Sequence, residues 1–326
     1  MYDYYDSPSS LYLKEENERI GIKFIGTVAG LCCIAYVLIQ NILSIMLTMS
    51  PLGKIYAADS TMESVVSIFF SIFGLLLPFA VGGIFIGRKN GKTDFGFCKP
   101  VSTSLMLSAV PLGFFICLAG NYVTSIFVNL MGNIGVELSA PEYPVPEGFA
   151  GRLIYTVSIA VVPALVEEFA IRGVVMQPLR RYGDKFAILA SAIFFAVLHG
   201  NLIQAPFALI AGIGIGYAVC ITNSVWTGVL IHFCNNLYSV VLEFMIADIQ
   251  NEDILNVVYM VSTVILYALS ILGSVIFLFI KNKRKVLPSF TALSETRKMR
   301  AFILTIPMII ALLIMLRVTS YYVQLG

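Results

Sequence analysis

The segment IYTVSIAVVPALVEEFAIRGVVM, residues 154–176, is apolar except for three charged side chains in its second half, Glu167, Glu168 and Arg172. Its length suits the roughly 20 residues that an α-helix needs to cross the about 30 Å hydrocarbon core of a bilayer. Insertion scales assign a cost of about 2.5–3.5 kcal/mol to Asp, Lys or Arg at the centre of a membrane helix. The charged side chains should therefore face protein rather than lipid, and the segment predicts a polar site inside a membrane-spanning bundle.

The rest of the chain has the same character. Of its 326 residues, 58% are hydrophobic and 12% are charged, which is too little polar surface for a soluble globule of this size. The predicted fold is therefore an all-α polytopic membrane helix bundle of eight to nine transmembrane helices. Nine apolar runs carry this prediction, at residues 22–49, 65–87, 104–130, 154–176, 186–199, 205–221, 225–246, 257–280 and 301–316.

No soluble domain is expected between these runs, because the longest stretches between them are only about twenty residues. We expect N-terminal transmembrane helices in residues 1–153, a central core of four helices in residues 154–246, and C-terminal transmembrane helices in residues 247–326.

Basic residues are distributed unevenly between the loops. With the N-terminus in the cytoplasm, 17 of the 21 Lys and Arg residues fall in inner segments, and only Lys54, Arg152 and Arg317 fall in outer ones. Cytoplasmic loops are enriched in Lys and Arg, so the pattern predicts an integral membrane protein with a cytoplasmic N-terminus, in the cell membrane if the source is bacterial. The net charge of +2 reflects this topology. Nucleic acid is not an expected partner, because it would need a basic face on a soluble surface.

Spacing within the charged segment separates its two glutamates. Glu168 and Arg172 are four residues apart with the acid first, which places both on one helical face as a charge-assisted pair. Glu167 is rotated by about 100° from Glu168 and has no such local partner, so it is a candidate general base. Pro163 cannot donate to the carbonyl of Ile159, which predicts that the helix is kinked or opened one turn before Glu167.

The chain has only two histidines, and both fall in or at the end of predicted helices. His199 ends FAVLH, where Phe195 lies on the same face and can buttress the imidazole. His232 begins HFCNN, which places Asn236 on its own face. At 1.5 Å per residue, both histidines, Asn236 and Glu167 come out roughly 10 to 20 Å from the predicted cytoplasmic ends of their runs. One histidine in a span is more often a packing residue, but four polar side chains at one level favour a site.

Other motifs are weaker. GIGIG, residues 212–216, lacks the Lys and Ser or Thr of a phosphate loop and is typical of close helix packing. No nucleophile elbow, HExxH or GxGD-like pair occurs, which disfavours serine and aspartyl intramembrane protease chemistry. The six cysteines have no metal-finger spacing.

The motifs EEFAIR (167–172), FAVLH (195–199) and HFCNN (232–236) fit the patterns EExxxR, FxxxH and HxxxN, in that order. Together they resemble the CPBP family of intramembrane proteases, which is named for CAAX prenyl endopeptidases and bacteriocin processing and is also called Abi. The resemblance covers residues 154–246 and implies that this core is catalytic. It implies hydrolysis of a peptide bond in a membrane-associated peptide or protein substrate.

The resemblance also implies a role for each motif residue. Glu167 and His199 would activate a water molecule. His232 and Asn236 would stabilise the oxyanion of the tetrahedral intermediate, a role that suits two donors one helical turn apart. Asn235, three residues after His232, could reach the same site.

Zinc is a further possibility, because the family is often labelled metalloprotease. Glu167, His199 and His232 would then supply three ligands and leave a fourth position open. The two histidines lie on separate helices rather than in an i,i+4 pair, and Asn236 is a poor zinc ligand but a good oxyanion donor. We therefore favour a site without an obligatory cofactor.

The same residues allow other interpretations. Intramembrane Glu, Arg and His could form the proton pathway of a transporter, although we find no inverted repeat. A non-catalytic membrane immunity or scaffold protein of the same fold is a third reading. Under the family resemblance, Glu168, Arg172 and Phe195 would give structural support. Bacteriocin leader removal, self-immunity and processing of another membrane-bound peptide all stay open.

Overall fold

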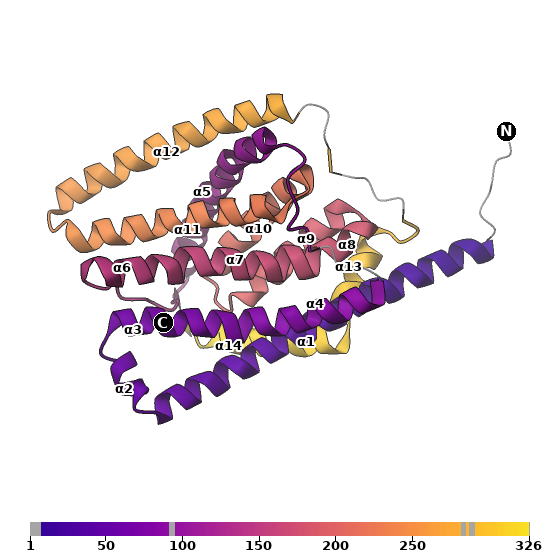
Figure 1. Cartoon of the computed structure of the whole chain (residues 1–326), viewed down its shortest axis with the longest axis horizontal. Helices are drawn as coiled ribbons and strands as arrows, with labels where there is room; N and C mark the ends of the chain where they lie inside the picture. Colours follow the sequence, from indigo (N-terminus) through magenta and orange to yellow (C-terminus); the bar gives the residue numbers. More distant parts are fainter. Residues whose placement is uncertain (1–7, 91–94, 282–284, 287–290, 326) are drawn as a thin grey trace.

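The computed structural model describes residues 8–90, 95–281, 285–286 and 291–325. This part of the chain is a bundle of helices with a single two-stranded sheet, which confirms the predicted polytopic helical fold (Figure 1). Three basic residues that the orientation count includes, Lys92, Lys283 and Arg284, lie outside the described residues.

The N-terminal third contributes three long helical segments. The first is α1, 42 residues or about 63 Å at 1.5 Å per residue, roughly twice the hydrocarbon thickness. Its polar first turns therefore protrude from the bundle (Figure 1). The elements in order are α1 (Pro8–Met49), α2 (Leu52–Tyr56), α3 (Ser60–Phe70), the π-helical turn η1 (Ser71–Leu76), α4 (Leu77–Asn90) and α5 (Thr103–Asn133).

The charged segment lies on one continuous span, Gly148–Tyr182, in which α-helical and π-helical turns alternate. Its elements are α6 (Gly148–Thr156), η2 (Val157–Val161), α7 (Val162–Glu168), η3 (Phe169–Met176), α8 (Gln177–Leu179) and the 3₁₀ turn η4 (Arg180–Tyr182). The π-helical turn η2 directly precedes α7, whose second residue is Pro163. The predicted kink or opening thus takes the form of a widened turn, because i→i+5 bonding accommodates the N–H that proline lacks.

The next four helices are α9 (Asp184–Leu198), α10 (Gln204–Thr222), α11 (Val225–Asp248) and α12 (Glu252–Ile280). α10 packs against α5 and α9. In its most apolar 18-residue stretch 61% of the residues are buried, against 17% in that of α12. α10 is therefore central and α12 peripheral. α9 has 15 residues, about 22 Å, and Gly200 at φ +64° turns the chain back towards α10. The apolar run at residues 186–199 thus forms a helix shorter than the hydrocarbon thickness.

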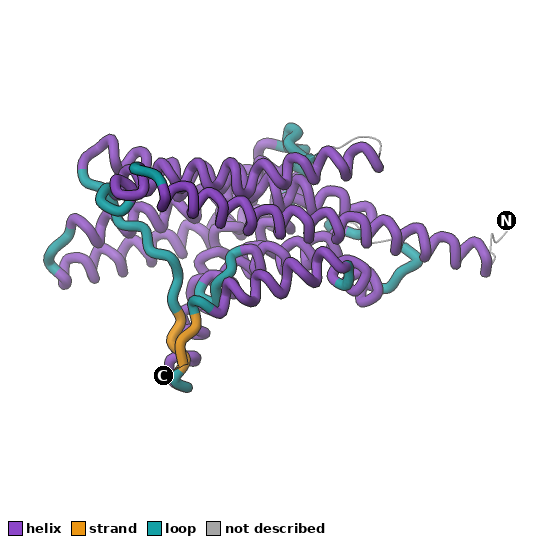
Figure 2. Tube along the Cα trace, turned by 90° about the horizontal axis from the view of Figure 1, so that it is seen from below, coloured by secondary structure: helices purple, strands orange, loops and turns teal. Residues whose placement is uncertain are grey.

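The C-terminal part is a bent helix pair followed by a strand. α13 (Glu295–Ile303) and α14 (Ile306–Ser320) meet at 73°, and counting the pair as one span raises the number of candidate spans from seven to eight among the described residues. β2 (Val323–Leu325) pairs antiparallel with β1 (Val136–Leu138). The two strands project from the helices and tie the C-terminal segment to the loop after α5 (Figure 2).

The described basic segments gather at one end of the bundle. The start of α1, the end of α4, the turn η4 that follows α8, the end of α12 and α13 all lie there (Figure 1). Glu18 accepts from the backbone N–H groups of Ala292 and Leu293, each at 3.0 Å, and the Lys298 ammonium donates to the carbonyl of Tyr182 at 2.7 Å. This grouping is what the expected orientation requires, and the cytoplasmic assignment of that end stays a prediction.

Candidate active site

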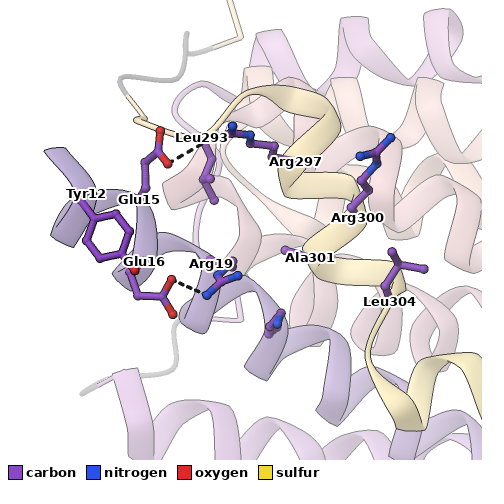
Figure 3. A pocket seen from close by; sticks show the side chains of 10 residues that line it. Tyr12, Glu15, Glu16, Arg19, Leu293, Arg297, Arg300, Ala301 and Leu304 are labelled. Carbon is purple, nitrogen blue, oxygen red and sulfur yellow. Dashed lines mark hydrogen bonds and ion pairs between the residues drawn. The ribbon is translucent and has the colours of Figure 1, made fainter.

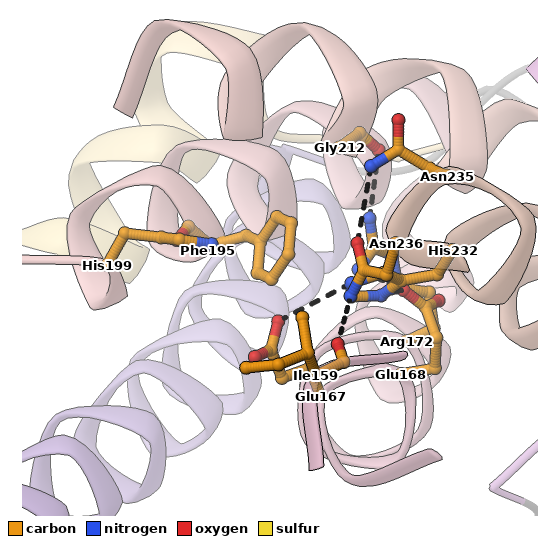
Figure 4. A network of polar contacts seen from close by, with 10 residues as sticks. All are labelled: Ile159, Glu167, Glu168, Arg172, Phe195, His199, Gly212, His232, Asn235 and Asn236. Atoms are coloured by element: carbon orange, nitrogen blue, oxygen red, sulfur yellow. Dashed lines mark hydrogen bonds and ion pairs between the residues drawn. The ribbon is translucent and has the colours of Figure 1, made fainter. Parts of the chain in front are cut away.

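A buried polar network lies where Gly148–Tyr182 meets α9, α10 and α11 (Figure 4). Arg172 Nη1 donates to Glu168 Oε1 at 2.7 Å, and both side chains are fully buried. Arg172 Nη2 reaches the carbonyl of Gly212 on α10 at 3.5 Å, and the guanidinium lies 4.7 Å from the centre of the Phe195 ring on α9. The i,i+4 pair therefore joins the charged span to two further helices.

His232 connects α11 to this network. Its Nδ1 lies 3.1 Å from Glu168 Oε1, and its Nε2 lies 3.9 Å from Glu167 Oε2. The Arg172-paired carboxylate of Glu168 accepts hydrogen bonds, so we assign the Nδ1 proton to this contact, which directs Nε2 towards Glu167. Glu168 thus orients the imidazole as well as pairing with Arg172.

Glu167 has a different environment from its neighbour. Its side chain is 24% exposed, whereas that of Glu168 is 0% exposed. Among the described residues its one ionic neighbour is His232, at a distance beyond hydrogen bonding. The Glu167 carboxylate therefore keeps its acceptor positions open to a small molecule such as water.

His199 directly follows α9, and its Nδ1 lies 2.8 Å from the carbonyl of Phe195. Because a carbonyl only accepts, Nδ1 carries the proton and Nε2 is the acceptor. The Phe195 ring packs edge-on at 4.6 Å from the His199 ring and at 6.1 Å from the His232 ring, so it lies between the two histidines (Figure 4). No hydrogen bond or ion pair within the described chain joins His199 to Glu167.

Asn236 makes a contact that sequence spacing did not predict. Its Nδ2 donates at 3.0 Å to the carbonyl of Ile159, the acceptor that Pro163 leaves without its α-helical donor. Asn235 Nδ2 donates to Asn236 Oδ1 at 3.2 Å. The orientation of the Asn236 amide is thus set from both sides, and one of its two N–H groups remains for a substrate.

Gly228 is a site residue that sequence reasoning missed. A Cβ at this position would lie 2.5 Å from Glu168 Oε2, so the glycine makes room for the buried carboxylate. The available signal was its position four residues before His232, on the same face of α11. Three buried polar atoms of the network have no hydrogen-bond partner among the described residues, namely Glu168 Oε2, Arg172 Nε and Asn235 Oδ1.

The proposed zinc ligands do not form a metal site in this arrangement. No group of three or more His, Cys, Asp or Glu side chains in the described chain is placed to hold a metal ion. His199 and His232 each have Nδ1 engaged and Nε2 available, as zinc ligands often do. The Phe195 ring nevertheless lies between His199 and His232, and among the described residues no hydrogen bond or ion pair joins His199 to Glu167.

The central segment is similar to a known family. Residues 149–238 match the family described as type II CAAX prenyl endopeptidase, Rce1-like. All three motifs lie within the match, which confirms the CAAX protease family that they predicted. None of the curated proteins and none of the solved structures matches the chain. With its long apolar helices, the chain is an integral membrane protein whose central segment is similar to this family.

Proposed function

We propose that this protein is an intramembrane endopeptidase that cleaves a peptide bond in a membrane-associated peptide or protein. The observation that carries the proposal is the approach of His232 Nε2 to the accessible carboxylate of Glu167, at 3.9 Å, while buried Glu168 holds the other ring nitrogen. An oxygen atom placed about 2.8 Å from each group would bridge them. The family match supports peptide hydrolysis as the reaction.

In the proposed reaction Glu167 is the general base. It takes a proton from a bound water, whose oxygen attacks the carbonyl carbon of the scissile peptide. As the family resemblance implies, His199 Nε2 would accept the second hydrogen bond of this water. Glu167 then returns its proton to the leaving amine, which yields a new carboxyl group and a new amino group.

His232 and Asn236 act on the developing oxyanion. His232 donates from Nε2, and Asn236 donates its remaining amide N–H. The contact with the Ile159 carbonyl presents this N–H without further reorganisation. Glu168, Arg172 and Phe195 support the site, and no step uses a metal. The membrane-bound peptides named above remain the candidate substrates.

The test is cleavage of a membrane-peptide library by full-length protein in liposomes, with products read by mass spectrometry. Wild-type protein should release defined fragments and Glu167→Gln protein none. Glu142→Gln, a change of an exposed loop carboxylate, serves as the matched control and should retain activity. Fragments of wild-type identity and rate from Glu167→Gln protein would overturn the assignment, and their absence from folded wild-type protein would favour a scaffold.

Two measurements separate the proposal from the other readings. Liposomes should show no proton or solute flux that depends on Glu167, and such a flux without cleavage would favour a transporter. Active protein purified without a His tag should keep its activity after prolonged chelation. Near-stoichiometric zinc, lost together with activity and restored with it, would instead make His232 a ligand.

A further inference from the structure

A pocket of about 430 Å³ lies between the first turns of α1 and α13, at the basic end of the bundle (Figure 3). Charged side chains dominate its rim, and three apolar side chains continue from it. The lining residues are Tyr12, Glu15, Glu16, Arg19, Lys23, Leu293, Arg297, Arg300, Ala301 and Leu304.

The rim has more positive than negative charge. Arg19 pairs with Glu16 at 2.5 Å, and Arg297 pairs with Glu15 at 3.1 Å. The two remaining cations, Lys23 and Arg300, form no ion pair with any described residue. Four cations thus face two carboxylates, and the carboxylates hold two of the arginines in place.

The two cations without ion pairs mark the polar–apolar boundary of their segments. Lys23 is the last charged residue before an apolar stretch that continues to Met49. Arg300 is the last before the apolar run at residues 301–316. Two segments far apart in sequence therefore bring their boundary cations to one pocket, at the level that lipid phosphates occupy in a bilayer.

Apolar contacts continue from the rim. Leu304, at the 73° bend between α13 and α14, is 60% exposed. Leu293 and Ala301 are buried and form the inner wall. A ligand that fits both parts has an anionic head and an apolar tail, and arginine pairs well with phosphate oxygens.

We propose that this pocket binds the phosphate of one anionic glycerophospholipid, with an acyl chain running along Leu304. The lipid would link α1 to α13 and so hold the two ends of the sequence together. This site is independent of the proposed peptidase activity and does not rest on it.

The experiment is native mass spectrometry of full-length protein in neutral detergent, titrated with phosphatidylglycerol or with phosphatidylcholine of the same acyl chains. Wild-type protein should retain one phosphatidylglycerol in preference to phosphatidylcholine. Neutralising Lys23→Gln should weaken this binding about fivefold, and the double change with Arg300→Gln roughly 30-fold. Arg88→Gln is the matched control, because Arg88 is an exposed boundary cation at the same end that does not line the pocket.

Equal retention of phosphatidylglycerol by the double variant and by Arg88→Gln protein would overturn the proposal. Equal binding of the two lipids by wild-type protein would do the same, and this comparison needs no variant. Inorganic phosphate at millimolar concentration tests the other source of the same chemistry. Displacement of the lipid by phosphate alone, at comparable affinity, would make the pocket a free-anion site.

Discussion

The span Gly148–Tyr182 contacts α11 through two polar regions, one buried and one largely exposed. The inner region is the network of Glu168, Arg172 and His232, where both members of the ion pair are 0% exposed. The outer region is the bidentate contact of Arg152 with Asp248, at 2.7 and 2.5 Å, where the side chains are 30% and 54% exposed.

A buried tyrosine reinforces the outer region. Tyr155 is 1% exposed, and its hydroxyl contacts the carboxylate of Glu243 on α11 and lies 3.3 Å from the carbonyl of Tyr143. Chemically similar contacts therefore join the same two helices at two depths. Removing one partner of a buried pair costs about 3–5 kcal/mol, whereas an exposed pair contributes about 0–1 kcal/mol. Burial of both charged partners, rather than residue type, therefore separates the inner ion pair from the exposed Arg152–Asp248 pair.

The largest expected effect concerns Glu167, which lies beside the inner region. Glu167→Gln removes the proposed general base and should lower the cleavage rate by about 10²–10⁴-fold, while the midpoint of thermal unfolding in detergent stays close to wild type. Its carboxylate forms no hydrogen bond with any described residue that the change would remove. Rates and unfolding curves of the same preparations check this. A large drop in stability with retained cleavage would assign Glu167 to the framework instead.

Next in size are the changes of the buried pair. Glu168→Gln or Arg172→Gln leaves an uncompensated charge in the protein interior and should destabilise the fold by about 3–5 kcal/mol. Thermal or denaturant unfolding in one detergent measures this. The double variant Glu168→Gln/Arg172→Gln should lose less than the sum of the single changes, because it removes both charges. Additive losses would show that the pair is not energetically coupled.

A third prediction concerns Asn236. Asn236→Ala should slow cleavage by about 10²–10³-fold through loss of an oxyanion donor. It should also destabilise the protein by about 1–3 kcal/mol, because the Ile159 carbonyl loses its donor. Adding Pro163→Ala supplies a backbone N–H to that carbonyl, so stability should recover while cleavage stays slow. Recovery of cleavage in the double variant would exclude a direct role for the amide.

The smallest effect is expected in the outer region. Arg152→Gln breaks an exposed contact with Asp248 and should change the free energy of unfolding by no more than about 1 kcal/mol. The effect should shrink further at high salt, because exposed charges are screened. Unfolding at low and high ionic strength provides the measurement. A loss as large as that of Arg172→Gln would contradict the distinction drawn between the two regions.

Much of the site could be predicted because its signals are local. The i,i+4 spacing predicts the Glu168–Arg172 pair, and a single helical turn places Phe195 beside His199. The contacts of His232 with Glu168 and of Asn236 with Ile159 join residues 64 and 77 positions apart. The periodicity of a sequence does not show how two helices are rotated relative to each other. These contacts could therefore be found only from the three-dimensional structure.

Two further features depend on how the helices pack and could not be predicted from the sequence. The apolar run at residues 186–199 predicts burial but cannot show that α9 stops short of a full crossing, which Gly200 and the packing of α10 determine. The approach of Lys23 to Arg300 depends on the docking of α13 against α1. The sequence of α1 alone does not indicate that α13 packs against it, and the sequence of α13 does not indicate α1.

The π-helical turns on either side of α7 change the direction in which the side chains after them point around the helix axis. Each turn with i→i+5 bonding holds one residue more than an α-helical turn, and one inserted residue advances everything beyond it by about 100° around the axis. The direction in which α7 points Glu167 and Glu168 around the helix axis is therefore set by η2. The π-helical turn η3 then shifts the direction of the residues that follow. A span of identical composition in uninterrupted α-helix would aim both carboxylates at different neighbours. The positions of the two carboxylates thus depend on the two π-helical turns as much as on the side chains themselves.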